Sequence, residues 1–206
     1  SVPFYDEIHR MIAEMSDWFL SRQSLVYDLG TSTGECIRRL HDRHADKKLS
    51  FIGVDFSEEM IRKAREKLSD IPNVQLLVSD LNRPFTIEGA DLVVSVLTLQ
   101  FLRLESRPRL LREAFQGLRE GGALIIVEKV MGSSPQFDEM WVDLHHDMKR
   151  RKGLSDYEIF AKARSLRGVL IPLSVEENMQ LIHQAGFQTA DIFFKWYDWV
   201  GILTIK

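Results

Sequence analysis

Short apolar runs alternate with helical patterns along this chain, and that alternation limits its fold more than any other feature. Five runs are predicted strands: Leu25–Leu29, Leu49–Asp55, Val74–Ser79, Asp91–Leu97 and Ala123–Glu128. Helical spacing of apolar residues marks three segments between them: Glu35–His44, Glu58–Leu68 and Arg107–Leu118. Strands and helices that alternate in this way form open, mostly parallel sheets with helices on both faces. The sequence therefore predicts an α/β fold.

A helical insertion is predicted after the fifth strand. Beyond Lys129 the pattern changes, and the segments Gln136–Arg151 and Ser155–Leu166 have helical character with no strand between them. We expect these two helices to form a lid, over about residues 132–170, at one edge of the sheet.

The C-terminal part of the chain is predicted to return to the sheet. Ser174 is the expected N-cap of a helix over Val175–Ala185. Two apolar runs follow, Gln188–Phe194 and Trp196–Ile205, and they are close enough to pair as an antiparallel hairpin. The sheet would then have seven strands. A chain of 206 residues, of which 45% are hydrophobic, suits a single domain over residues 1–206.

Composition excludes several classes of partner. The chain has 27 basic and 30 acidic residues, so no overall positive charge attracts nucleic acid or an anionic membrane. Its one cysteine, Cys36, rules out an internal disulfide and suits a reducing compartment. No apolar run approaches the roughly 18 residues of a membrane span. Because the stretch SVPFYDEIHR also lacks the layout of a signal peptide, we expect a cytoplasmic protein.

The turn after the first strand, in VYDLGTSTGE, is the candidate ligand site. Ligands of open α/β sheets bind at the carboxyl ends of the strands, where this turn would lie. Dinucleotide loops have glycine where this loop has Ser32, and the carboxylate of Glu35 would repel a pyrophosphate at the helix N-terminus. A ligand without phosphate escapes that penalty. S-adenosylmethionine, with its cationic sulfonium, fits these requirements.

Acidic residues follow three successive predicted strands. Asp28 would place negative charge near a cationic group, and Asp55 would accept hydrogen bonds from ribose hydroxyls. Asp80 would accept from the adenine amino group, with Leu81 against the ring. Two alternatives stay open: Asp55 helps only to cap the next helix, and Asp80 forms only a turn.

The order of elements resembles the Rossmann-like class I fold of S-adenosylmethionine-dependent methyltransferases. In that fold, strand-helix units build a mostly parallel sheet that an antiparallel hairpin completes. Dehydrogenases differ because their last strands remain parallel.

A closer resemblance extends over nearly the whole chain. Six stretches, SVPFYDEIHRMI, VYDLGTSTG, LTLQFL, QGLREGGALIIVEK, LHHDMKR and AGFQTADIFFKW, resemble the bacterial carboxy-S-adenosylmethionine synthase family. Members of that family convert S-adenosylmethionine and prephenate into carboxy-S-adenosylmethionine and phenylpyruvate. The resemblance implies that the product serves a separate enzyme that modifies a wobble uridine of transfer RNA. It also implies a homodimer.

The resemblance implies a set of cofactor-binding residues. Together with Asp28, the set comprises Tyr5, Gly30, Thr31, Ser32, Asp55, Phe56, Asp80, Leu81 and Val96. Three of these depart from the family: Thr31 replaces a cysteine, and Phe56 and Val96 replace asparagines. The asparagine at the position of Val96 can hydrogen-bond the ligand, which valine cannot do.

Residues of the predicted lid are candidates for substrate binding. By resemblance, Arg164 matches the arginine that binds the added carboxylate, a role suited to a bidentate guanidinium. His145, with Lys149 or Arg150, would help to neutralise a dianionic substrate. The alternatives are that Arg164 is a solvated surface residue and that the histidines only pack their helix.

Metal and nucleic-acid binding are not expected from this part of the chain. His145 and His146 are adjacent on a helix and point about 100° apart, so they do not readily share one ion. The basic run at 149–152 lacks the interleaved aromatic residues of a nucleic-acid platform.

Three functions remain open at this level. The first is a carboxy-S-adenosylmethionine synthase, for which the sequence identifies no catalytic base. The second is a methyltransferase that acts on a small molecule, and Val96 favours it. The third is a module that binds S-adenosylmethionine without turnover.

Overall fold

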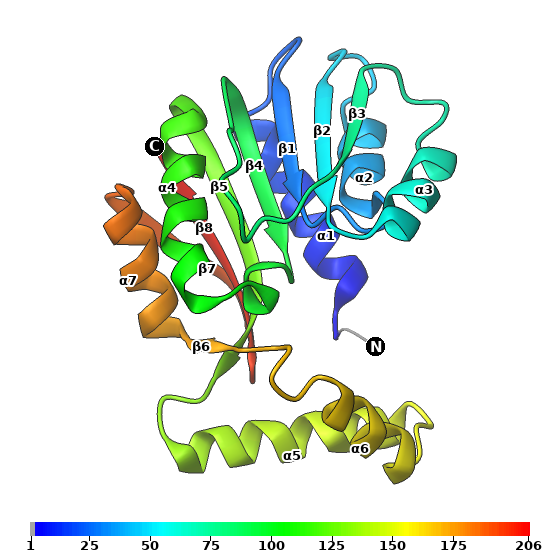
Figure 1. Ribbon diagram of the computed structural model, residues 1–206, viewed down its shortest axis with the longest axis vertical. Helices are drawn as coiled ribbons and strands as arrows, with labels where there is room; N and C mark the ends of the chain where they lie inside the picture. The colour runs from blue at the N-terminus through cyan, green and yellow to red at the C-terminus, as the bar shows by residue number, and fades with distance from the viewer. Residues whose placement is uncertain (1–2) are drawn as a thin grey trace.

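The computed structural model describes residues 3–206 and contains one large mixed sheet (Figure 1). The strand order is β3-β2-β1-β4-β5-β8-β7. Strands β1 to β5 are mutually parallel where they pair, and β8 runs antiparallel to both β5 and β7. Their bounds are β1 Leu25–Leu29, β2 Ser50–Asp55, β3 Val74–Val78, β4 Ala90–Val96, β5 Leu118–Met131, β7 Thr189–Trp196 and β8 Trp199–Ile205. The predicted class I methyltransferase fold and its C-terminal antiparallel hairpin are confirmed.

Helices cover both faces of the sheet (Figure 1). The helices are α1 Tyr5–Met15, α2 Glu35–Arg43, α3 Glu58–Lys67, α4 Arg107–Gly117 and α7 Val175–Ala185. Side chains of α4 and α7 join one hydrophobic core, and those of α1, α2 and α3 join the other. Neighbouring strand residues alternate between the cores: Ile125 belongs to one and Ile126 to the other, because successive strand side chains point to opposite faces.

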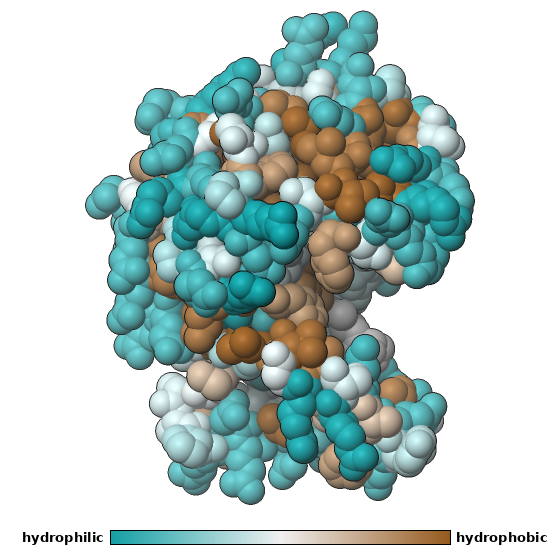
Figure 2. Space-filling model, viewed as in Figure 1, coloured by the Kyte–Doolittle hydropathy of each residue, from teal (hydrophilic) through white to brown (hydrophobic). Residues whose placement is uncertain are grey.

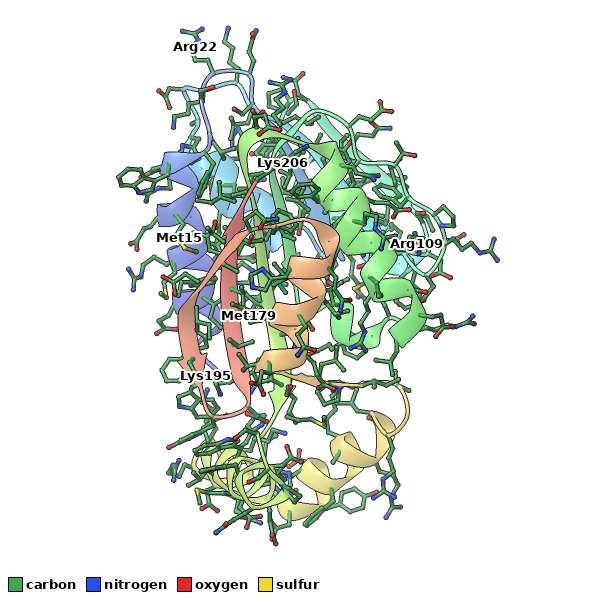
Figure 3. The ribbon with its side chains drawn as sticks, turned by 90° about the vertical axis from the view of Figure 1, so that its left-hand side faces the viewer. Met15, Arg22, Arg109, Met179, Lys195 and Lys206 are labelled. Carbon is green, nitrogen blue, oxygen red and sulfur yellow. The ribbon has the colours of Figure 1, made fainter. Side chains whose placement is uncertain are left out.

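A pair of helices stands away from the sheet. Helix α5 (Pro135–Arg151) follows β5, and α6 (Asp156–Ser165) begins at a capping box formed by Ser155 and Glu158. Figure 1 shows both helices beyond the carboxyl ends of the strands, and Figure 2 shows the surface hollowed between them and the main body. Figure 3 shows the β7–β8 hairpin end, near Lys195, lying above α5.

The chain returns from α6 through a short added strand. Strand β6 (Leu173–Ser174) pairs in parallel with the end of β5, Val130 opposite Leu173. This strand was not predicted. Strand β5, which pairs with it, continues to Met131, three residues beyond the predicted end at Glu128. At its other end β5 begins at Leu118, because Leu118 pairs with Ala90 across an irregularity in the ladder.

Other short elements complete the description. Helix α1 was not predicted, although Ile8 and Ile12 lie four residues apart and are both buried. Three short 3₁₀ helices occur at Ser16–Trp18, Leu99–Phe101 and Leu104–Ser106. Within residues 3–206 no helix combines the length and apolar character that crossing a membrane requires.

Candidate functional site

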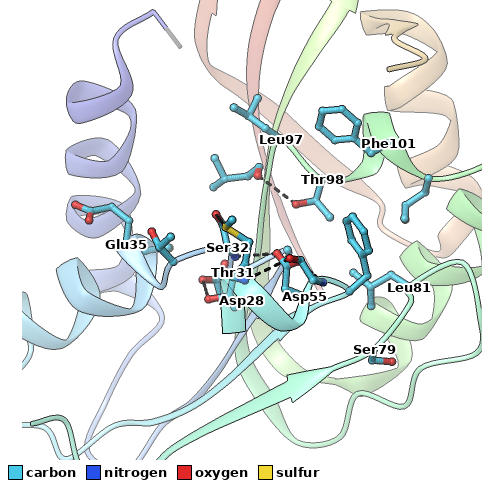
Figure 4. A pocket seen from close by; sticks show the side chains of 18 of the residues that line it. Asp28, Thr31, Ser32, Glu35, Asp55, Ser79, Leu81, Leu97, Thr98 and Phe101 are labelled. Carbon is cyan, nitrogen blue, oxygen red and sulfur yellow. Dashed lines mark hydrogen bonds between the residues drawn. The ribbon is translucent and has the colours of Figure 1, made fainter. Parts of the chain in front are cut away.

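A cavity of about 1230 Å³ lies at the carboxyl ends of β1 to β4 (Figure 4). The strand order places β1 beside both β2 and β4, and this change of direction is where ligands of open α/β sheets bind. All ten residues of the predicted cofactor set line this cavity: Tyr5, Asp28, Gly30, Thr31, Ser32, Asp55, Phe56, Asp80, Leu81 and Val96. The fold therefore places all ten selected residues around one cavity. Their contact with a cofactor stays a prediction.

The glycine loop is held against β2 by backbone hydrogen bonds. The N–H groups of Gly30 and Thr31 both donate to the carbonyl oxygen of Val54, at 2.8 Å each. Gly30, Ser32 and Gly34 have φ values of 78°, 50° and 80°. Such positive φ values cost little at glycine, whereas Ser32 carries a real penalty. Ser32 is exposed and lines the cavity, so strained backbone lies at the ligand side of the loop.

Thr98, which the sequence analysis did not select, packs against the glycine loop at Gly30. Its hydroxyl donates to the carbonyl oxygen of Leu29 at 2.9 Å and lies close to that of Val96 at 3.2 Å. A Cβ atom at Gly30 would lie 2.0 Å from the Thr98 Oγ1 atom. The LTLQFL stretch therefore packs on the glycine turn that defines the site.

Asp28 is the most deeply buried acid of the cavity wall. Its side chain is 2% exposed, and the Thr31 hydroxyl donates to Asp28 Oδ2 at 2.6 Å. Burial raises the pKa of Asp28 to about 6, the Thr31 hydrogen bond opposes that shift, and the charge of Asp55 adds to it. A buried acid of this kind gains most from a cationic ligand, because the ligand would restore the favourable interactions that water no longer provides.

Asp55 and Asp80 already hold the turns in which they lie. Asp55 accepts from the N–H groups of Ser32 and Ser57 at 2.9 Å each. Asp80 accepts from the N–H and the side-chain amide of Asn82, and its pKa is lowered mainly by that backbone hydrogen bond. The capping and turn alternatives thus describe real contacts. Each carboxylate has further lone pairs, which leaves both able to accept from a ligand.

Glu35 has a different environment from the one that the sequence argument assumed. Burial alone would raise the pKa of its carboxyl, but hydrogen bonds from Lys67 and Arg39 lower it to about 2. The Arg39 Nε to Glu35 Oε1 distance is 2.6 Å, and Lys67 also contacts the carboxylate. Two cations therefore balance the charge that was expected to repel a pyrophosphate. The electrostatic case for a cationic ligand depends on Asp28 and Asp55 instead.

Tyr5 and His9 form the wall of the cavity on the α1 side. Burial, reinforced by the charge of Glu35, raises the pKa of the Tyr5 hydroxyl to about 12. His9 is 3% exposed and donates from Nδ1 to the carbonyl oxygen of Tyr5 at 2.8 Å. Burial also lowers the pKa of His9, so its imidazole is neutral. This wall offers aromatic surface and no positive charge.

The segment at 97–102 is fixed by two buried polar side chains, those of Glu128 and Arg107. Glu128 accepts from the N–H groups of Thr98, Leu99 and Gln100 at 2.9 to 3.2 Å. Arg107 donates to the carbonyl oxygens of Gln100, Leu102 and Ile171 at 2.7 to 3.2 Å. This segment supplies Leu97, Thr98, Phe101 and Leu102 to the cavity wall.

The carboxyl of Glu128, which accepts these three hydrogen bonds, is buried. Burial raises the pKa of Glu128 to about 8, although its three backbone hydrogen bonds and the charge of Arg107 act in the opposite direction.

Val96 and Leu97 give this part of the wall an apolar character. Val96 is half-buried and lines the cavity, so it offers a ligand contact area but no hydrogen bond. Leu97 has a φ of 56°, an unfavourable conformation for leucine, and its N–H donates to the carbonyl oxygen of Val127 at 2.7 Å.

The four predicted substrate-binding residues do not line the cavity. His145 is buried and contacts Asp198 Oδ2 at 3.3 Å, beside the hairpin. Arg150 pairs with Asp147 and Asp156 at 2.7 Å each. Lys149 is half-buried, and Arg164 is exposed. The packing alternative therefore describes His145, and neighbouring carboxylates occupy the guanidinium of Arg150.

Lys162 of α6 lines the cavity in place of Arg164. Residues two apart on a helix point in directions about 200° apart, so the two side chains cannot share one face. Sequence comparison alone does not reveal which face of α6 the fold turns toward the site.

Metal ligands are not gathered at this site. Among residues 3–206, no group of three or more histidine, cysteine, aspartate or glutamate side chains is placed to hold a metal ion.

Known proteins share both the sequence and the fold of this chain. A model of a methyltransferase domain matches residues 26–122. The carboxy-S-adenosyl-L-methionine synthase of Methylococcus capsulatus is 41% identical over this whole chain and 86% of its own length. The enzyme of the same name from Staphylococcus epidermidis is 36% identical over the whole chain and 89% of its own length. The chain belongs to the carboxy-S-adenosyl-L-methionine synthase family.

Solved structures extend the likeness of this synthase-family chain to the fold alone. The YcgJ protein of Bacillus subtilis superposes with a TM-score of 0.72 at 14% identity, over 98% of this chain and 99% of its own. Human N-acetylserotonin methyltransferase, determined with S-adenosylmethionine, gives a TM-score of 0.65 at 16% identity, over 98% of this chain and 52% of its own.

Proposed function

We propose that this protein is a carboxy-S-adenosyl-L-methionine synthase that uses prephenate as the carboxyl donor. Relatives with that name match the whole chain at 30–41% identity, which supports the proposal. The single structural observation that carries it is the acidic wall of the cavity, where Asp28 and Asp55 face the glycine loop.

The cavity fits S-adenosylmethionine rather than a nucleotide that carries a diphosphate. Its volume of about 1230 Å³ lies above the usual range for a site that holds one small ligand, so it has room for S-adenosylmethionine beside a second small substrate. Asp28, buried beside the loop, suits an ammonium or sulfonium cation, whereas a diphosphate would add negative charge to an acidic site. Phe56 is 77% exposed and lies in the cavity wall, where an adenosine could cover it.

The proposed reaction balances without an added reductant or oxidant. Prephenate loses one carboxyl group and its ring hydroxyl, and its ring becomes aromatic. S-adenosylmethionine, when bound, supplies a sulfonium methyl group whose carbon receives the carboxyl group. The proton displaced from that methyl group leaves with the hydroxyl as water. The cavity residues act by binding and alignment, which alone contributes greatly to the rate when two substrates meet.

A methyltransferase that acts on a small molecule is the second candidate. Val96 favours it, because this wall residue cannot make the hydrogen bond available to the asparagine of the family. A methyltransferase requires mainly an aligned acceptor, and the apolar surface near Val96, Leu97 and Phe101 could hold one.

Mass spectrometry of the small molecule that co-purifies with the protein separates the two candidates. A synthase should yield a molecule heavier than S-adenosylmethionine by one carbon dioxide. Prephenate added to the protein loaded with S-adenosylmethionine should yield phenylpyruvate. Only unmodified or demethylated cofactor, with no phenylpyruvate formed, would contradict the synthase and favour the methyltransferase.

The cellular role and assembly are further parts of the proposal. We infer a cytoplasmic homodimer whose product serves a separate enzyme of transfer RNA modification, without direct contact between this protein and the nucleic acid. The sequence resemblance supports these points. Exposed apolar residues on the two outer helices, Phe137, Met140 and Phe160, offer surface for a second copy. Sedimentation equilibrium that gave a monomer at micromolar concentration would contradict the dimer.

A further inference from the structure

The charges that line the cavity are unevenly distributed. Four acidic residues belong to the wall formed by the sheet and the first helices: Asp28, Glu35, Asp55 and Asp80. His9 on the same side is neutral because burial lowers its pKa. Among the described residues that line the cavity, Lys162 of α6 is the only one that carries a full positive charge. A ligand with both charges would therefore turn its cation toward the sheet and its anion toward α6.

Helix α6 and the turn after it are the part of the lid that reaches the cavity. Lys162, within α6, and Val169, in the turn that follows the helix, both line it. Arg164 lies between them in sequence but is absent from the wall. The side chain to which the resemblance assigns the added carboxylate is therefore not part of the cavity wall.

Lys162 is also free to accept an anionic partner. Within residues 3–206, no carboxylate oxygen lies within 4.0 Å of the ammonium nitrogen of Lys162 or of Lys149. Lys149 is half-buried, and its pKa is lowered by burial and then by the charge of Lys129; the charge of Asp198 opposes this shift, and that of Lys162 adds to it. Asp198 already pairs with Lys129 at 3.2 Å and balances the repulsion among these cations only in part, so an anion added near Lys162 would reduce it further.

We propose that Lys162 is the residue that binds the carboxylate by which carboxy-S-adenosylmethionine differs from S-adenosylmethionine, and that Lys149 strengthens the positive potential there. This inference rests on the proposed synthase function. It makes Lys162 a specificity-determining residue, because unmodified S-adenosylmethionine has no group at that position to occupy it.

Titration calorimetry with the two purified ligands tests the proposal directly. The proteins are the wild type, Lys162→Met, Lys162→Arg and the matched control Arg164→Met, which lies on the same helix and is also exposed. The wild type should bind the carboxylated ligand about tenfold or more tightly than S-adenosylmethionine, as one charge-assisted hydrogen bond provides. Lys162→Met should remove that preference and leave the affinity for S-adenosylmethionine within about twofold of the wild-type value.

The two controls should behave like the wild type. Lys162→Arg should keep the preference because it keeps the charge, and Arg164→Met should keep it because that side chain lies outside the cavity wall. Thermal melting checks that every variant is folded. Because Lys162 is exposed, we expect its replacement to leave the melting temperature nearly unchanged.

Other outcomes overturn the inference, and they do so separately from the proposed function. A preference that survives in Lys162→Met, or is lost only in Arg164→Met, would show that Lys162 does not bind the added carboxylate. Equal weakening of both ligands by Lys162→Met would place the lysine at the amino-acid carboxylate that both share. A wild-type protein without any preference would contradict the synthase function itself.

Discussion

The hydroxyl of Thr98 occupies the space that a side chain at Gly30 would need. A Cβ atom there would meet Oγ1 at 2.0 Å and the Thr98 Cβ at 2.8 Å, so the clash involves the body of the side chain. The Thr98 hydroxyl also donates to the Leu29 carbonyl oxygen, which keeps the threonine in place. The turn that forms the ligand site and the LTLQFL segment must therefore fit together as one unit.

Gly30→Ala should consequently destabilise the protein far more than the same change at Gly121. Gly121 is a matched control, because its φ of 77° equals that of Gly30 at 78° within a degree, yet no atom lies within 4 Å of its Cβ position. We expect Gly121→Ala to lower the free energy of unfolding by about 1 kcal/mol through backbone strain alone. Gly30→Ala should lower it by about 3 kcal/mol or more. Urea denaturation measures both changes. Equal losses of unfolding free energy would show that the Thr98 side chain moves aside without cost.

Asp28→Asn should weaken cofactor binding while it stabilises the protein without ligand. The folded-state pKa of about 6 lies above the ordinary value of 3.8, so folding opposes ionisation of this carboxyl. Through this group, wild-type stability rises as the pH falls from above 6 toward 4, and it is lowest above pH 6. A neutral asparagine avoids that cost, and the free energy of unfolding at pH 7 should rise by about 1–3 kcal/mol. Urea denaturation at pH 7 and at pH 4 would measure the difference.

The same carboxyl predicts the pH dependence of ligand affinity. A cationic ligand favours ionised Asp28, so wild-type affinity for S-adenosylmethionine should decline as the pH falls below about 6. Asp28→Asn should bind more weakly at neutral pH and lose this dependence. Calorimetric titrations between pH 5 and pH 8 check both points, and a wild-type affinity that did not change over this range would exclude Asp28 as the cation's partner.

Arg107→Leu should loosen the cavity wall together with the segment that returns from the lid. The guanidinium is 2% exposed and donates to Leu102, Gln100 and Ile171, so its loss leaves buried carbonyl oxygens without a donor. We expect the free energy of unfolding to fall by about 3 kcal/mol and S-adenosylmethionine to bind less tightly.

Arg112 on the same helix is the control for that change. Arg112 is exposed, and within residues 3–206 no hydrogen bond or ion pair of its side chain occurs. Arg112→Leu should change the free energy of unfolding by no more than about 0.5 kcal/mol. Similar losses for both variants in urea denaturation would mean that the buried donor contributes nothing specific.

Much of the sheet could be predicted because its strands are buried on both faces. A continuous apolar run bounded by turn residues, such as Ala123–Glu128, is typical of a strand that is buried on both faces. Once the strands are placed, the positions of the acids at the carboxyl ends of β1 and β2 follow. Those positions fixed one side of the cavity, including Asp28 and Asp55. The short strand β6 could not be found in this way, since two residues carry no periodicity.

The lid side of the site depends on tertiary contacts that no local pattern records. Whether Lys162 or Arg164 turns inward depends on the orientation of α6, which its own sequence does not determine, because nearly every residue of that helix is exposed. Glu35 was misjudged for a related reason: its partner Lys67 is far away in the sequence and reaches it only after α2 and α3 pack together.

The position of β8 between β5 and β7 has a consequence for synthesis on the ribosome. The two antiparallel strands that finish this side of the sheet emerge after α5, α6 and α7. Until β8 arrives, the apolar stretch Ala123–Val127 keeps one edge of its backbone unpaired, and β7 has no neighbour through which to join the sheet. A nascent chain at that stage would present an unpaired strand edge as a template for aggregation, and this is the segment that a chaperone of nascent chains would need to cover.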